Sequence, residues 1–531
     1  MDILAAIGEW RQILGESRVL SDGEGLAAYG VDASAISRRI PAALKIVDAA
    51  SLPAVIKVAR RYGVPVYPVS TGKNWGYGTA LPATDDCVVI DLSDMRRIID
   101  FDAELGVVTL EPGVTQAMLA DFLDNGNHPF LVPVTGAGPQ CSLVGNALER
   151  GYGVTPYVDH FGAVTDLEAV LADGSIYRTA LREAGGDDLA RLFKWGIGPY
   201  STGLFTQSGF GIVTRMSILL ARRPECVKVC LFSLKDDALL EPAVERIRSI
   251  LSRLPGTVGA INLMNRHRVL AMSAPYPAEQ LGEDGLIPAS VVEALGGQYQ
   301  ILPWTGFGTL YGTRRMVAAA QKEIRSALSG VASRLLFISP GGARKLADLA
   351  GLLPGAAGRR LASTAGTLAK SLELVAGRPN ETALPLCYWR NPEGVTEGGM
   401  DPARDGCGLI WYAPLVPMRP GDVRRYVGMV QAVCIKHRLE PLITFTSISD
   451  KLFDSTVPLI FARGTAEAGQ AAKNCYNELL KTGRELGFFP YRVGVETMQT
   501  LAGWMVDSKA MHARLRAALD PEGAISPGRY Q

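Results

Sequence analysis

Short apolar runs alternate with stretches of helical spacing over residues 1–222. Strand-like runs lie at 43–47, 64–69, 88–92 and 107–113, and helical spacing at 1–11, 52–62 and 115–123. Thr115 has a side chain suited to capping the third of these helices. Alternation of this kind is typical of helices layered on a sheet. The pattern therefore predicts an α/β unit that ends near residue 222.

The pattern changes after Arg222-Arg-Pro224. Strand-like runs follow at 227–234, 304–311, 335–339, 409–413, 442–446 and 458–461, and helices are predicted at 239–254, 314–328 and 421–437. Residues 341–378 are rich in Gly, Ala and Leu and predict helices and loops. The strand–helix–strand order occurs twice, which suggests two similar halves in one α+β domain. A last amphipathic helix at 508–519, before the turns of 520–528, predicts an ordered tail that packs on the body.

A glycine-rich loop joins the runs at 64–69 and 88–92. Gly72, Gly76 and Gly78 fall within seven residues. Without a Cβ, their backbone can approach a ligand closely, and successive N–H groups can form a concave anion site. A strand follows the loop instead of a helix, so the loop favours a pyrophosphate site other than a dinucleotide fingerprint. The alternative is a glycine-rich hairpin with no ligand.

Two further glycine-rich segments make the ligand hypothesis the stronger one. They span residues 134–160 and 203–214. Three separated loops of this type indicate a surface that wraps one long, thin ligand.

Bulk composition narrows the function classes. A chain of 531 residues predicts two or three domains. With a net charge of +1, it gives no electrostatic case for nucleic acid or an anionic membrane. The start of the chain carries Asp2 and Glu9 and predicts an amphipathic helix instead of a signal peptide. Eight dispersed cysteines without a CxxC pair, and five dispersed histidines, argue against a metal site and fit the reducing cytoplasm.

Six segments together resemble the vanillyl-alcohol oxidase / p-cresol methylhydroxylase family of FAD enzymes. They are residues 72–78, 145–160, 193–200, 203–207, 491–495 and 520–528, in the family's order. The resemblance implies a two-domain α+β flavoprotein. Residues 1–222 would form the FAD-binding domain, 223–485 a cap domain with an antiparallel sheet flanked by helices, and 486–531 a segment that returns to the FAD domain.

The resemblance also implies which residues bind FAD. They are Ser70, Thr71, Gly72, Lys73, Asn74, Gly76, Pro133, Thr135, Gly136, Ser142, Gly145, Asn146, Gly151, Gly153, Tyr157, Gly211, Ile212, Val213 and Arg529.

The family oxidises para-alkylphenols, and the resemblance carries that expectation to this chain. The substrate is held as a phenolate, hydride leaves the benzylic carbon for the flavin, and a nucleophile attacks the resulting p-quinone methide. Ionising a phenol of pKa about 10 at neutral pH requires strong stabilisation of the anion. Charge-assisted hydrogen bonds supply it, and the matching residues are Tyr77, Tyr491 and Arg492. Without the resemblance, each would be taken for a packing or surface residue.

Asp159 matches an acidic residue that lies near the flavin in the family. A carboxylate there can act as a base or stabilise developing charge. The alternative is an aspartate that caps the turn after Pro156. His160 is predicted to be structural, and Asn146 and Glu149 to support the loops.

Two departures from the family pattern concern the flavin link and the substrate. Leu409 stands where some members attach FAD through histidine, and Cys387 or Tyr388 falls near the position of a tyrosyl link, so non-covalent FAD is the simplest prediction. A histidine pair after the strand at 442–446 is missing, with Asp454 nearby. Together with an insertion at 391–405, its absence predicts a different or larger phenol.

Three readings of function remain open. The first is a 4-alkyl- or 4-allylphenol oxidoreductase that passes electrons to O₂ or to a separate c-type cytochrome, because the chain has no CxxCH motif. The second is an FAD enzyme of the same fold acting on a hydroxy acid or a sugar, and the third is a flavin-free binding protein. Family members imply a homodimer.

Overall fold

The N-terminal part of the chain forms a small, mostly parallel sheet. The computed structural model describes residues 1–352, 365–366, 368–395 and 399–531. In the order β1-β2-β4-β3, the strands are β1 (Val19–Leu20), β2 (Ala43–Lys45), β4 (Val88–Asp91) and β3 (Val66–Val69). Helices α1 (Ile3–Leu14), α2 (Gly23–Ala27) and α3 (Leu52–Arg61) accompany it. Trp10, Val55 and Ile90 belong to one buried cluster, so α1 and α3 share a core with the sheet.

Strands β3 and β4 run parallel, with Val66 opposite Val88. A hairpin requires antiparallel strands. The glycine-rich loop at 70–79 is therefore part of a crossover connection, and the hairpin alternative is wrong.

A second sheet is antiparallel throughout. Its order is β5 (Ile98–Asp102), β6 (Val107–Leu110), β9 (Ile212–Leu219), β7 (Val164–Val170) and β8 (Ile176–Tyr177). Helices α4 (Gln116–Asn125), α5 (Leu143–Leu148), α6 (Ala180–Glu183) and α7 (Asp187–Ala190) lie in its connections. Thr115 caps α4 as predicted, because its hydroxyl accepts a hydrogen bond from the Met118 backbone N–H.

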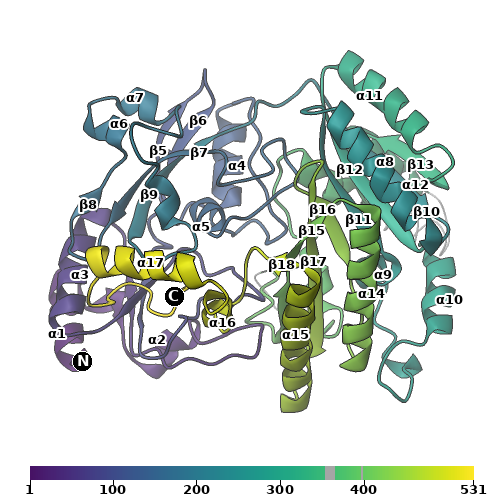
Figure 1. Ribbon diagram of the computed structural model, residues 1–531. Coiled ribbons are helices and arrows are strands. Elements are labelled where there is room, and N and C mark those ends of the chain that lie inside the picture. The colour runs from purple at the N-terminus through teal and green to yellow at the C-terminus, as the bar shows by residue number, and fades with distance from the viewer. Residues whose placement is uncertain (353–364, 367, 396–398) are drawn as a thin grey trace.

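A nine-stranded antiparallel sheet dominates the other half of the molecule (Figure 1). Its strands are β10 (Cys226–Leu234), β11 (Val258–Asn265), β12 (Trp304–Gly312), β13 (Arg334–Ile338), β14 (Cys407–Tyr412), β15 (Pro414–Pro417), β16 (Thr444–Ser447), β17 (Leu452–Ala462) and β18 (Phe489–Pro490). One face is covered by α8 (Leu240–Arg253), α11 (Arg314–Ala327), α14 (Pro420–Lys436) and α15 (Ala466–Leu486), which share its main core. Helices α9 (Arg266–Ser273), α10 (Ala289–Tyr299) and α12 (Pro340–Gly351) complete this half. The mixed α+β class is the one predicted.

Several predicted elements differ from the structure. The pattern missed β11, and the apolar run at 458–461 is only the end of the longer β17. Of the helices and loops expected over 341–378, α12 and the helical residues 368–375 are seen, while 353–364 and 367 lie outside the described residues. Residues 396–398 of the expected insertion also lie outside them.

The C-terminal tail crosses back to the N-terminal half (Figure 1). Val66 N–H donates to the Ala524 carbonyl, and Ser526 N–H donates to the Val66 carbonyl, both at 2.8 Å. Helices α16 (Met498–Ala502) and α17 (Val506–Leu519) precede this contact, and α17 contains no fully buried residue. The tail therefore packs on the body as predicted, although the contact is made by the segment after α17 and not by an apolar face of that helix.

Within the described part of the chain, no helix is both long and apolar enough to span a bilayer.

Candidate functional site

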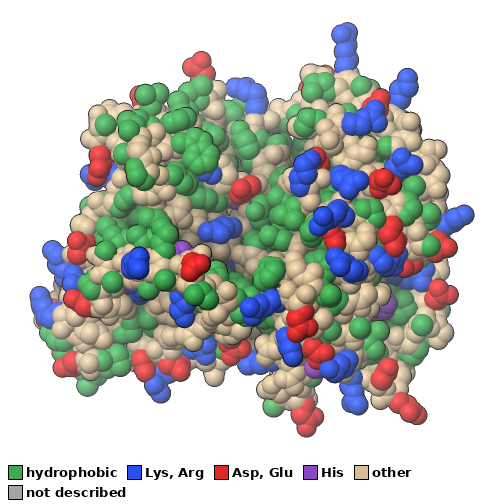
Figure 2. All heavy atoms as spheres, viewed as in Figure 1, with side chains coloured by type: hydrophobic (Ala, Val, Ile, Leu, Met, Phe, Trp, Pro, Cys, Tyr) green, Lys and Arg blue, Asp and Glu red, His purple; other side chains and the backbone are tan. Residues whose placement is uncertain are grey.

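The two halves meet at a cavity of about 420 Å³, and the surface is hollowed between them (Figure 2). The N-terminal half contributes the loop after β3 and residues 135–152. The nine-stranded sheet contributes residues of β14 and β17 from the face opposite its helices, and the tail contributes Tyr491, Arg492 and Arg529. Segments from both ends of the chain thus share one site.

The glycine-rich loop after β3 needs its glycines. Gly72, Gly76 and Gly78 have φ values of 65°, 77° and 113°, a region that side chains disfavour. A Cβ on Gly76 would lie 2.4 Å from Trp411 Cδ1. Trp411 N–H also donates to the Gly76 carbonyl at 3.2 Å. The loop is shaped both by its backbone and by the close approach of strand β14.

This loop packs on the start of α5. Ser142 N–H donates to Thr71 Oγ1 at 3.1 Å, and the Ser142 hydroxyl caps the helix by accepting from Gly145 N–H. A Cβ on Gly145 would lie 2.3 Å from Ser70 Oγ. Exposed backbone and hydroxyl groups along this seam form a cradle without bulky side chains, which fits a phosphate-bearing ligand such as FAD.

Most of the residues predicted to bind FAD line the cavity. These are Ser70, Thr71, Gly72, Lys73, Asn74, Thr135, Gly136, Ser142, Gly145, Asn146, Gly151, Gly211, Val213 and Arg529. Gly76, Pro133, Gly153, Tyr157 and Ile212 are not among its lining residues. Ile212 is fully buried in β9 and Tyr157 is exposed, so neither side chain is directed at the cavity.

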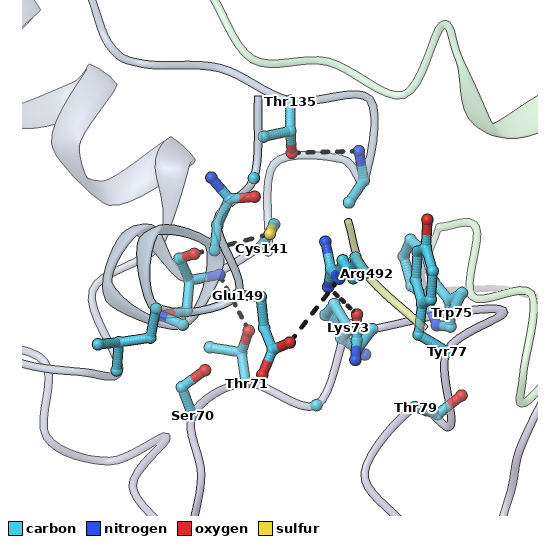
Figure 3. Close-up of a pocket in the computed structure, with 18 of the residues that line it drawn as sticks. Ser70, Thr71, Lys73, Trp75, Tyr77, Thr79, Thr135, Cys141, Glu149 and Arg492 are labelled. Atoms are coloured by element: carbon cyan, nitrogen blue, oxygen red, sulfur yellow. Dashed lines mark hydrogen bonds and ion pairs between the residues drawn. The ribbon is translucent and has the colours of Figure 1, made fainter. Parts of the chain in front are cut away.

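Tyr77, Tyr491 and Arg492 come together as predicted. The Arg492 guanidinium carbon lies 4.4 Å from the centre of the Tyr77 ring, and Arg492 also donates to Asn74 Oδ1. Figure 3 shows Arg492 between Glu149 and Tyr77. Burial raises the pKa of both tyrosines, so both phenols stay protonated and can donate hydrogen bonds. The cluster can therefore offer two hydroxyl donors and one cation to a bound anion.

Glu149 has a larger part than the sequence indicated. Its carboxylate pairs with Arg529 and lies 3.8 Å from Arg492 Nε. Although burial alone would raise the pKa of Glu149, the two guanidinium groups lower it below its usual value. Glu149 therefore fixes the positions of two cations that line the cavity.

Replacing Glu149 by glutamine should destabilise the protein by about 3–5 kcal/mol, because two buried guanidinium groups lose their counter-ion. Since the folded pKa is lowered, this contribution is present above the unfolded pKa of about 4.3 and is lost as the pH falls through the folded value. Thermal unfolding of both proteins between pH 2 and 7 should show the difference in Tm shrinking as the pH falls below about 4.3.

Glu168→Gln is the matched control. Glu168 also lies between two arginines, Arg178 at 2.8 Å and Arg215 at 3.4 Å, and is similarly exposed, at 14% against 16% for Glu149. It lies outside the cavity. Of the two variants, only Glu149→Gln should reduce the content of bound flavin. Equal flavin content in the two variants would show that Glu149 does not position the cations that line the cavity.

Asp454 is a second carboxyl group that lines the cavity. It is 5% exposed, and its Oδ1 has no hydrogen-bond partner among the described residues. Burial raises the pKa of Asp454 to about 7, against the opposing effects of Arg492 and of a hydrogen bond with Tyr491. A carboxyl group with such a raised pKa beside Tyr491 and Arg492 is suited to move a proton.

Asp159 lies elsewhere. It is exposed, and its carboxylate accepts a hydrogen bond from Gly162 N–H at 2.8 Å, as the turn-capping alternative expects. His160 is buried, and burial lowers its pKa to about 4. Its ring nitrogen contacts Asn146 at 2.5 Å, which agrees with a structural role.

Cys387 and Tyr388 differ in their access to the cavity. Cys387 lines it, and burial raises the pKa of its thiol to about 12, so the thiol stays protonated at neutral pH. The Tyr388 hydroxyl instead donates to Asp405 Oδ2 at 2.6 Å and is not among the lining residues. Of the two predicted positions for a covalent link, the structure brings only Cys387 to the site.

Sequence reasoning missed several lining residues. Arg268, Leu386, Trp411 and Thr456 all come from the half of the molecule that holds the nine-stranded sheet. Only alternation along β14 and β17 could have marked Trp411 and Thr456. Lys73 pairs with Asp401 of the expected insertion at 2.6 Å, and Trp75 donates to the same carboxylate at 3.2 Å.

Comparisons with known proteins indicate an FAD enzyme. A family model described as "FAD binding domain" matches residues 41–180. The 1'-carboxy-chondrochloren decarboxylase of Chondromyces crocatus is 33% identical, over 99% of this chain and 96% of that protein. The 4-cresol dehydrogenase [hydroxylating] flavoprotein subunit of Pseudomonas putida is 27% identical, over 99% and 94%.

Solved structures give the same result. The crystal structure of p-cresol methylhydroxylase with substrate bound has a TM-score of 0.87 at 25% identity, covering 99% of this chain and 96% of that one. The 4-ethylphenol oxidase from Gulosibacter chungangensis, in its isoeugenol complex, shares the fold with a TM-score of 0.88 at 22% identity, covering 99% and 97%. The chain therefore belongs to the p-cresol methylhydroxylase family of FAD-dependent oxidoreductases.

Proposed function

We propose that this enzyme oxidises the benzylic carbon of a para-substituted phenol. The observation that carries the proposal is the single cluster of Tyr77, Tyr491 and Arg492 next to Asp454 in the cavity between the halves. An FAD enzyme of this fold that acts on a hydroxy acid would not need to keep these three residues, so their presence together favours the phenol as the substrate class.

Different residues bind the cofactor and the substrate. Thr71, Gly72, Ser142 and Arg529 would hold FAD along the cradle. When bound there, FAD would supply the hydride acceptor for oxidation of the benzylic carbon. The two tyrosine hydroxyls and the Arg492 guanidinium bind the phenolate oxygen and lower the free energy of the ionised substrate.

Asp454 takes the role first assigned to Asp159. Its carboxylate accepts the phenol's proton, relayed through the hydroxyl of Tyr491, with which it shares a hydrogen bond. The substrate then enters oxidation as the anion, from which a p-quinone methide forms when hydride is lost. Water or another nucleophile completes the reaction at the benzylic carbon.

A second candidate is oxidative decarboxylation. It is favoured by the 33%-identical relative, whose name describes a decarboxylase. The same hydride loss would give the quinone methide of a phenol whose side chain carries a carboxylate on the carbon next to the benzylic carbon. The electron pair of the bond to the carboxylate would then form a C=C bond, restoring the phenolate and releasing CO₂.

The test is an anaerobic absorbance spectrum of the purified protein before and after 4-ethylphenol or eugenol is added. We expect the flavin band to be lost on addition, because hydride reaches the flavin. A flavin band that persists with these and with bulkier phenols would overturn the proposal. Release of CO₂ with a carboxylated phenol separates the second candidate from the first.

The remaining assignments complete the proposal. The electron acceptor is O₂ or a separate c-type cytochrome, and readmitting air to the reduced protein distinguishes them. We further propose a homodimer that holds FAD without a covalent bond and works in the cytoplasm. Denaturation followed by filtration would leave FAD with the protein only if the link were covalent.

A further inference from the structure

Arg268 lines the cavity and has no counter-ion among the described residues. It lies in the first turn of α9 beside two basic neighbours that each have a carboxylate partner: Arg266 with Glu293 at 3.3 Å, and His267 with Glu440 at 3.7 Å. Arg268 forms no ion pair with any described residue. Its Nε donates to Thr444 Oγ1 at 2.9 Å, and its Nη1 has no hydrogen-bond partner in the described part of the chain.

The surroundings of Arg268 make its unpaired positive charge energetically unfavourable. Burial lowers the pKa of Arg268 to about 10, so its charged form is poorly solvated. It also lies at the N-terminal end of a helix, where the helix dipole disfavours a cation. Leu386, Cys387 and Leu409 line the same cavity and offer no negative charge. A bound anion would relieve each of these penalties.

The position of Arg268 separates it from the phenol-binding cluster. In the pairing of β16 with β17, Thr444 lies opposite Thr456, and Thr446 lies opposite Asp454. Thr456 and Asp454 both line the cavity, and two residues along a strand span about 7 Å. Asp454 lies with Tyr491 and Arg492 at one end, and Arg268, anchored on Thr444, lies farther along the same strand pair.

We propose that the substrate is a phenol whose para side chain carries a carboxylate, and that Arg268 binds this carboxylate. The inference rests on the proposed phenol oxidation and names its substrate class. A substrate held at both ends would place its phenolate on Arg492 and its carboxylate on Arg268, with the benzylic carbon between them. The planar guanidinium matches a carboxylate through two parallel hydrogen bonds, which a neutral alkyl chain cannot accept.

The test compares 4-hydroxyphenylpropanoate with 4-propylphenol in the FAD-loaded wild type and in Arg268→Met. Binding is followed by the flavin difference spectrum, and reduction by anaerobic stopped flow. Wild type should prefer the carboxylate. Arg268→Met should weaken its binding roughly 10- to 100-fold, as the loss of a charged hydrogen-bond partner predicts, while binding of 4-propylphenol stays the same or tightens.

Two further variants keep the test decisive. Arg268→Lys keeps the charge without the planar fork and should recover part of the preference. Thr444→Val removes the contact that orients Arg268 and should weaken carboxylate binding less than Arg268→Met does. If Arg268→Met does not fold with FAD, these two carry the comparison.

The outcomes separate this inference from the proposed function. If neither phenol reduces the wild-type flavin, the proposed function fails. If both reduce it and Arg268→Met binds them with unchanged relative affinity, only the Arg268 inference fails. The inference is also overturned if Arg268→Met changes the flavin spectrum or reduction potential before any phenol is added, because Arg268 would then pair with the cofactor.

Discussion

Arg492→Met should lower the rate of flavin reduction by 4-alkylphenols by roughly 100- to 1,000-fold, the effect of removing one donor to a developing oxyanion. Arg492 stacks on Tyr77, donates to Asn74 and lies 3.8 Å from Glu149, so it presents its charge to the cavity from a fixed position. FAD should remain bound, because Glu149 keeps its pair with Arg529. Stopped-flow reduction at pH 7 and the flavin content of the purified variant check both expectations.

Arg390→Met is the matched control. The Arg390 guanidinium carbon also lies over a tyrosine ring, 4.7 Å from the centre of Tyr276, but Arg390 does not line the cavity. This variant should reduce at the wild-type rate, and Arg492→Lys should fall between the two. An Arg492→Met protein that reduces as fast as wild type would refute the phenolate assignment.

Asp454→Asn should slow flavin reduction by about 100- to 10,000-fold, the usual contribution of a positioned acid or base. The pKa of Asp454 is raised to about 7, so its carboxylate, the form that accepts the proton, is populated above that pH. The wild-type rate should therefore rise with pH and level off above about 7. The asparagine variant should lack this ionisation, which a pH series of stopped-flow reductions would show.

Stability gives a second readout for the same variant. The folded pKa of Asp454 lies above the unfolded value of about 3.9, so the native state binds the proton more tightly. The stabilisation of the folded state by protonated Asp454 is present below pH 3.9 and is lost as the pH rises through about 7. Asp454→Asn should then melt higher than wild type at pH 8. Asp159→Asn, which changes an exposed turn cap, is the control, and a larger kinetic effect there would restore Asp159 as the base.

The local part of the fold could be predicted from the sequence. Thr115 capping α4, and the strands on either side of the glycine-rich loop, follow from hydrogen bonding and periodicity within a few residues. The pairing of β3 with β4 did not follow, because a parallel crossover and a hairpin give the same local pattern. The exposure of α17 could not be predicted either, because it depends on the contact of Ile525 and Ser526 with Val66.

The candidate site was predictable only as far as a family motif marks each residue. Tyr77, Tyr491 and Arg492 were named and do meet. Glu149 and Asp454 were undervalued, because their importance comes from cations and hydroxyls brought in from residues 491–529. Arg268 carried no signal, since whether an arginine is paired is a property of its three-dimensional neighbours.

The crossing of the tail back to β3 has a consequence for how the enzyme is made. Tyr491, Arg492 and Arg529 are translated after every strand of the three sheets, yet all three line the cavity. A growing chain folds its N-terminal parts first. Glu149, next to the glycine-rich loop, then remains unpaired until Arg492 and Arg529 have been synthesised. The nascent protein should thus gain its cofactor only near the end of synthesis, and slow translation after residue 490 would prolong its exposure to chaperones and proteases.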